Sequence, residues 1–93
     1  MTDEPRLLYL EPDEEITSVV RRLRETDATW VVLVVPGRSR ATASAVGLRL
    51  LASFAAEAGR DLALVADAST RALAAEAGIA VFATVADVSA GTV

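Results

Sequence analysis

The chain has 93 residues, of which 53% are hydrophobic, and a net charge of −4, so it is long enough for one domain with a modest core. Because it contains no cysteine and no histidine, disulfides and thiolate sites are excluded, and the commonest general base and metal ligand are missing. The acidic balance argues against nucleic acid as a partner. With no signal-like start and no long apolar run, the sequence predicts one cytoplasmic domain, residues 1–93, with no direct membrane insertion. All nine basic residues are Arg, which is typical of a GC-rich bacterial genome.

The first predicted elements are a short strand and an amphipathic helix. The strand covers residues 6–10. Asp13 is the predicted N-cap of the helix, with Thr17 as the alternative, because Glu14 and Glu15 would then lie in the first turn, where the helix dipole favours acidic side chains. Apolar residues at helical spacing predict one buried stripe: Ile16, Val19, Val20 and Leu23.

The run WVVLVVP, residues 30–36, is the strongest signal in the chain. Six apolar residues without a charge end at Pro36 and Gly37, a pattern typical of a strand buried on both faces. A strand covered on both faces needs helices above and below it. The run therefore predicts a three-layer α/β domain.

A polar interval follows, and then a helix over residues 42–58. Gly47 would let this helix approach the sheet closely, at a propensity cost of about 1 kcal/mol, and Gly59 is the predicted left-handed residue at its end. Leu48 is expected at the side of the apolar face. That face is predicted to consist of Ala43, Val46, Gly47, Leu50, Leu51, Phe54, Ala55 and Ala58.

The remaining residues predict a strand over 62–66, a helix over 68–77 with Asp67 as its cap, and a strand over 79–83. Residues 84–87 have the spacing of a capping box with Asp at its fourth position. This box would open a fourth helix just before the sequence ends, so we expect the domain to be the N-terminal part of a larger protein.

Strands that alternate with helices predict a four-stranded, mainly parallel sheet with right-handed crossovers and helices on both faces, a Rossmann-like or flavodoxin-like arrangement. By analogy with small flavodoxin-like sheets, the predicted strand order is 2-1-3-4. That order would place a ligand crevice between the first and third strands, beyond their carboxyl ends.

The loop after the central strand is the candidate binding site. Arg38, Ser39, Arg40, Thr42 and Ser44 offer guanidinium groups and hydroxyls near a helix N-terminus, which together could hold an anion. The alternative is that the hydroxyls cap the helix and the arginines are solvated. The loop has one glycine and no lysine, so it is neither a Walker A loop nor a GxGxxG turn.

The acidic residues after the first strand have two interpretations. Glu11, Asp13, Glu14 and Glu15 could chelate Mg²⁺ together with Asp67, or they could serve as helix caps and N-terminal charges. The second interpretation is favoured, and no metal or cofactor is predicted. Because no nucleophile–base pair can be assembled, the chain is not expected to be an enzyme; a hydrolase would have to use Glu11 and Asp67.

From Thr17 to Val88, the order of segments resembles the sulfate-transporter and anti-sigma-factor-antagonist (STAS) domain: helix, Val-rich strand, polar loop, Gly47-Leu48, strand, short helix, glycine and a strand with Phe. The family's Asp-Ser-Ser-Gly-Leu motif aligns with Ser44 to Leu48, so that Ala45 stands at the position phosphorylated in the antagonists. The resemblance implies the fold, while the phosphorylatable serine is missing.

The chain also resembles a small N-terminal domain of bacterial baseplate-J-like proteins, through residues 8–12 (LYLEP) and 46–51 (VGLRLL). That resemblance implies an accessory or assembly role. Two functions are therefore expected. The first is a non-catalytic protein–protein interaction or assembly module, whose partner is another protein or another domain of the same chain. The alternative is a small regulatory domain that binds an anion or nucleotide with residues 37–44.

Overall fold

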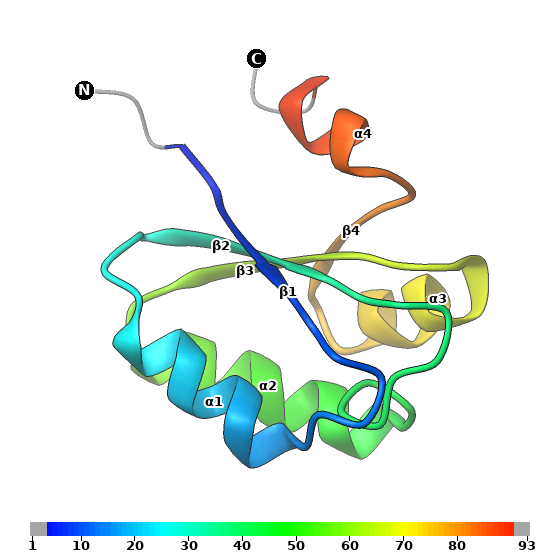
Figure 1. Ribbon diagram of the computed structural model, residues 1–93, viewed down its shortest axis with the longest axis horizontal. Coiled ribbons are helices and arrows are strands. Elements are labelled where there is room, and N and C mark those ends of the chain that lie inside the picture. Colours follow the sequence, from blue (N-terminus) through cyan, green and yellow to red (C-terminus); the bar gives the residue numbers. More distant parts are fainter. Residues whose placement is uncertain (1–3, 91–93) are drawn as a thin grey trace.

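The structure is a computed structural model that describes residues 4–90. Four strands alternate with four helices (Figure 1). The elements are β1 (Arg6–Tyr9), α1 (Ile16–Glu25), β2 (Trp30–Val34), α2 (Ala45–Glu57), β3 (Asp61–Val65), α3 (Ala68–Glu76), β4 (Ala80–Phe82) and α4 (Val85–Ala90). The predicted order of elements is confirmed, and most boundaries differ by one to three residues.

The four strands form one all-parallel sheet in the order β1-β2-β3-β4. The predicted parallel sheet is confirmed, but the predicted order 2-1-3-4 is wrong. The two continuous apolar runs, β2 and β3, fill the two central positions, where both faces are covered. β1 has an exposed residue at each end and β4 has only three residues, so each of them suits an edge. The expected crevice between the first and third strands does not exist, because β2 lies between them.

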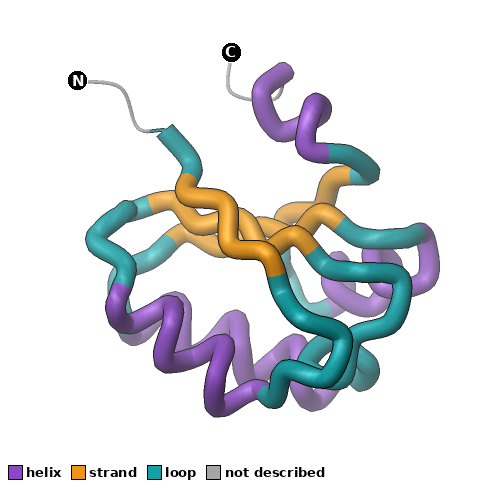
Figure 2. The backbone as a smooth tube through the Cα atoms, in the orientation of Figure 1, coloured by secondary structure: helices purple, strands orange, loops and turns teal. Residues whose placement is uncertain are grey.

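Helices cover both faces of the sheet, but unequally (Figures 1 and 2). One face packs against α1, α2 and α3, which contribute Leu23, Leu51 and Ala74 to the larger core cluster. Of the helices within residues 4–90, α4 packs on the other face, through the buried Val88 and the partly buried Val85. Crossovers of one hand in a sheet of consecutive order bring their helices to a single face, which accounts for the asymmetry.

The central strand is buried as predicted. Val31, Val32 and Leu33 are all fully buried, although neighbouring side chains of a strand point to opposite faces. Val31 and Leu33 belong to the core beneath α1–α3, and Val32 belongs to the cluster beneath α4. The prediction of a three-layer domain built on this strand is therefore confirmed.

The first helix starts later than predicted. Its N-cap position is Glu15, which makes no side-chain cap hydrogen bond, so the prediction of Asp13 as the cap is wrong, and the alternative Thr17 lies inside the helix. The chain turns at residues 12–13, and Glu14 accepts hydrogen bonds from Ser18 and Arg22. The predicted apolar stripe of α1 is confirmed, with three of its four residues buried and Ile16 packed at the margin of the core.

The buried face of α2 is rotated from the one predicted. Leu48, expected at the side, is fully buried, whereas Val46 is 65% exposed and Leu50 is 44% exposed. Gly47 approaches Ile16 of α1 and the loop before α2, where the prediction had placed it against the sheet. The rotation leaves two large aliphatic side chains at the start of α2 on the surface.

Three other predicted helix boundaries are confirmed. Gly59 adopts a positive φ of 71°, as expected for the residue that follows α2. Asp67 caps α3, and Thr84 and Asp87 form the reciprocal hydrogen bonds of the predicted capping box at the start of α4, both 3.2 Å long. Among residues 4–90, no helix has the length and apolar character that a membrane span requires.

Candidate functional site: a groove at the carboxyl edge of the sheet

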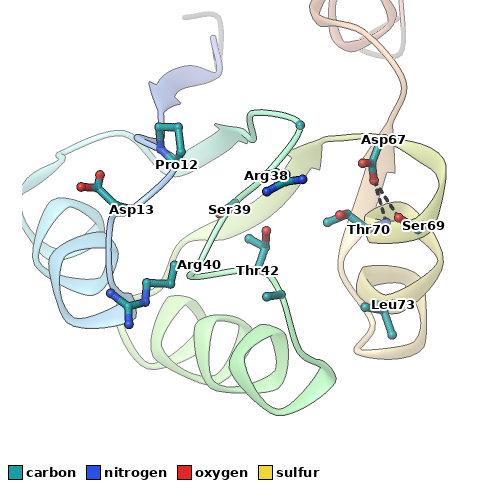
Figure 3. Close-up of a pocket in the computed structure, with 12 residues that line it drawn as sticks. Pro12, Asp13, Arg38, Ser39, Arg40, Thr42, Asp67, Ser69, Thr70 and Leu73 are labelled. Atoms are coloured by element: carbon teal, nitrogen blue, oxygen red, sulfur yellow. Dashed lines mark hydrogen bonds between the residues drawn. The ribbon is translucent and has the colours of Figure 1, made fainter.

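A groove of about 560 Å³ lies beyond the carboxyl ends of β2 and β3 (Figure 3). Its walls come from the loops that follow β1, β2 and β3. The lining residues are Pro12, Asp13, Gly37, Arg38, Ser39, Arg40, Thr42, Ala43, Asp67, Ser69, Thr70 and Leu73. Ligands of parallel α/β sheets bind at this edge, and the volume lies within the range of small-molecule sites.

The loop between β2 and α2 is held in place at three points. The backbone N–H of Arg40 donates to the carbonyl of Pro12 at 3.0 Å, which joins this loop to the one after β1. Ala41 is buried in the main core. Ser44 accepts a hydrogen bond from the backbone N–H of Gly47 at 3.0 Å and so caps α2. These contacts fix the path of the backbone along one wall of the groove.

Three polar side chains of this loop have no partner. Ser39 Oγ is buried and forms no hydrogen bond within residues 4–90. Thr42 is only 2% exposed and lines the groove, yet none of the side-chain hydrogen bonds in the same part of the chain involves it. Arg38 is exposed and takes part in none of the three ion pairs found there. The loop thus offers unused hydrogen-bonding groups to the groove.

The opposite wall is built on Asp67 at the start of α3. Its Oδ1 accepts hydrogen bonds from the backbone N–H of Thr70 at 2.9 Å and from Ser69 Oγ at 3.1 Å (Figure 3). These bonds, first of all the one from the Thr70 backbone, lower the pKa of Asp67 below its ordinary value. The carboxylate is therefore ionised at neutral pH. The side chain of Thr70 also helps to lower this pKa. The hydrogen bonds from the Thr70 backbone and from Ser69 both go to Oδ1 and leave lone pairs of Oδ2 unused.

The groove brings together four of the five predicted site residues: Arg38, Ser39, Arg40 and Thr42. Ser44 is not among the lining residues, because its hydroxyl caps α2, as the alternative interpretation proposed. The guanidinium of Arg40 lies on the side away from α3, with Nη1 4.0 Å from Oε1 of Glu15 (Figure 3).

The wall from α3 was missed as part of this site. The wrong strand order separated the loop after β2 from the loop after β3, although these strands are neighbours. The sequence contained evidence for the correct order. The runs that form β2 and β3 are both largely apolar, and two strands of this type belong side by side at the centre of a parallel sheet.

The acidic residues after β1 do not form a metal site in the structure. Within residues 4–90, no group of three or more acidic side chains lies close enough to hold a metal ion. Glu14 binds the Arg22 guanidinium instead, with Nη1 2.8 Å from Oε1. Glu11 does not line the groove that contains Asp67, so the two carboxylates of the hydrolase alternative do not share this pocket.

No family model, curated protein or solved structure matches the chain. The STAS-like and baseplate-J-like resemblances therefore stay predictions, and the function has to be argued from the groove itself.

Proposed function

We propose that the chain is a non-catalytic regulatory domain that binds a small anion in the edge groove. The observation that carries this proposal is the buried Ser39 Oγ without a hydrogen-bond partner, on the same wall as the unpaired Arg38. A buried polar group left unsatisfied costs about 1–3 kcal/mol. An anion oxygen that accepts from Ser39 and from Arg38 would recover this cost and would form charge-assisted hydrogen bonds.

A second buried polar atom, Nε of Arg60, also lacks a partner, but its situation differs. The same guanidinium already donates through Nη2 to the carbonyl of Thr26. The hydroxyl of Ser39 forms no bond at all within the described residues. Of the two orphan atoms, the one in the groove therefore has the greater need of a ligand.

The test is calorimetric titration with inorganic phosphate, acetate and AMP, which cover small anions and the nucleotide alternative. We expect saturable binding of at least one probe, and Arg38→Ala should weaken it about tenfold or more, in line with a lost charge-assisted bond. Arg49→Ala is the matched control, because Arg49 is exposed on α2 outside the groove. No binding of any probe, or equal weakening by both variants, would contradict the proposal.

The second candidate is the protein–protein interaction or assembly module. It is favoured by the exposed Val46 and Leu50, which lie one turn apart on α2. In this proposal the partner is another protein, or another domain of the same polypeptide, in a bacterial cytoplasm. The baseplate-J-like resemblance implies an assembly role of this kind, whereas the STAS-like resemblance implies the fold.

In-cell crosslinking followed by mass spectrometry tests this second candidate. Val46→Asp with Leu50→Asp should remove crosslinks to a specific partner, because a carboxylate on the contact face opposes desolvation. Ala72→Asp, at an exposed position of α3, is the control and should retain them. Unchanged crosslinks in the double variant would count against this surface.

A further inference from the structure

Two opposite charges face the same groove without pairing. Arg38 and Asp67 both line it, from the loop after β2 and from the start of α3, and lie on its two sides (Figure 3). No ion pair within 4.0 Å joins them, and the three ion pairs of residues 4–90 involve other side chains. An arginine in contact with a carboxylate oxygen would form a charge-assisted hydrogen bond. The groove separates the two charges instead.

Each charge has unused capacity for a ligand. The guanidinium of Arg38 makes no hydrogen bond within the described residues and can bind a carboxylate through two parallel N–H groups. Oδ1 of Asp67 accepts the two hydrogen bonds that cap α3, and Oδ2 keeps acceptor capacity for a donor in the groove. The lowered pKa of Asp67 keeps that oxygen charged.

The side chains nearest these two charges in the groove are neutral, and two more charged residues, Asp13 and Arg40, line it on the side away from α3 (Figure 3). Ser39 and Thr42 supply hydroxyls on the side of Arg38, and Leu73 supplies a partly buried apolar surface on the side of α3. A multiply charged anion would meet repulsion from Asp67. A ligand with one negative end, one positive end and an apolar body complements the part of the wall formed by Arg38, Leu73 and Asp67.

We propose that the groove binds a small zwitterion of the α-amino acid class with an aliphatic side chain. Its carboxylate binds Arg38 and Ser39, its ammonium group binds Oδ2 of Asp67, and its side chain packs on Leu73. This inference deepens the proposed anion-binding function and rests on it, because the carboxylate is the anion.

Three probes of matched shape test the inference by calorimetry: leucine, 4-methylpentanoate, which lacks the ammonium group, and 3-methylbutylamine, which lacks the carboxylate. We expect leucine to bind about tenfold more tightly than either of the others, because each of them forfeits one charge-assisted contact.

Asp67→Asn is the informative variant. Asparagine caps a helix as well as aspartate does, so α3 keeps its start while Oδ2 is replaced by an amide nitrogen. The affinity of this variant for leucine should fall to its affinity for 4-methylpentanoate. The variant should bind 4-methylpentanoate at least as tightly as the unaltered domain does. Arg38→Ala should weaken the binding of both carboxylate probes, leucine and 4-methylpentanoate. Arg49→Ala should change neither affinity. Circular dichroism confirms that each variant is folded.

The outcomes separate the two proposals. The zwitterion proposal is overturned if leucine binds no more tightly than 4-methylpentanoate. It is also overturned if leucine binds the Asp67→Asn variant as tightly as the unaltered domain. If 4-methylpentanoate or phosphate still binds in a manner that depends on Arg38, the anion-binding function stands. Absence of binding for all these probes, AMP included, overturns both.

Discussion

A Cβ atom added to Gly47 would lie 3.0 Å from Cδ1 of Ile16 and 3.0 Å from the carbonyl oxygen of Ala41. Alanine would improve helix propensity by about 1 kcal/mol, but over-packing costs about 1–3 kcal/mol. The Ala41 contact is to backbone, which cannot rotate away. We therefore expect Gly47→Ala to lower the free energy of unfolding by about 1 kcal/mol, measured by urea denaturation.

Gly37→Ala is the matched control for this prediction. A Cβ at Gly37 would meet nothing within 4 Å. The substitution should leave stability unchanged or raise it by up to about 1 kcal/mol, because the unfolded chain loses freedom. If the Gly47→Ala variant is as stable as the Gly37→Ala variant, α1 and the loop before α2 can shift to accommodate the added Cβ with little loss of stability.

The sequence predicted those parts of the fold that depend on local chemistry. The uninterrupted run at the centre required cover on two faces, and glycine and capping residues marked three helix boundaries, although not the start of α1. Asp67, Gly59 and the box at residues 84–87 all occupy their predicted places.

The parts that depend on competition between elements could not be predicted in this way. The strand order was taken from analogy, whereas in the structure β1 lies at an edge, where the residues at its two ends stay exposed. The face of α2 was predicted by counting apolar residues, but tertiary packing buries Leu48 and leaves Val46 outside. The loop residues of the site were found because polar groups collect there, and the α3 wall was missed with the strand order.

Protonation of Glu14 should destabilise the domain. Its side chain is 8% exposed and that of Arg22 is 32% exposed. Partial burial raises the pKa of Glu14, but the hydrogen bonds from Ser18, the Glu11 backbone and Arg22 outweigh it and lower the pKa below its ordinary value. Because the folded-state pKa is depressed, this stability is present above the unfolded-state pKa and is lost as the pH falls through the folded-state pKa.

Glu14→Gln should therefore cost about 1.5 kcal/mol at pH 7, the low end for a charged hydrogen bond because Arg22 is partly exposed. The cost should shrink between about pH 5 and pH 3. Urea denaturation across this range measures both effects. Glu57→Gln, at an exposed position of α2, is the control. Equal pH dependence in the two variants would contradict the role assigned to Glu14.

Val88 should hold α4 on the second face of the sheet. It is 1% exposed and belongs to the cluster that contains Val32 and Ala63, with Trp30 partly buried against it. Val88→Ala removes two buried carbon atoms and should cost about 1.5–2.5 kcal/mol. Trp30 should also become more accessible to acrylamide quenching. Val46→Ala, the same change at an exposed position, should alter stability by less than about 0.5 kcal/mol.

Two serines only five residues apart should respond in opposite directions to replacement by alanine. Ser44 caps α2, so Ser44→Ala should lower the free energy of unfolding by about 1 kcal/mol. Ser39 buries a hydroxyl without a partner, so Ser39→Ala should raise the free energy of unfolding by about 1 kcal/mol or more in the ligand-free domain.

Groups that serve a binding site often lower the stability of the ligand-free protein. Ser39→Ala should therefore lower the affinity for the anion that Arg38 binds, even as the ligand-free domain becomes harder to unfold. Paired urea denaturation and calorimetric titration measure the two effects on the same samples. If Ser39→Ala stabilises the domain and leaves anion affinity intact, the hydroxyl is a packing defect and takes no part in the binding site.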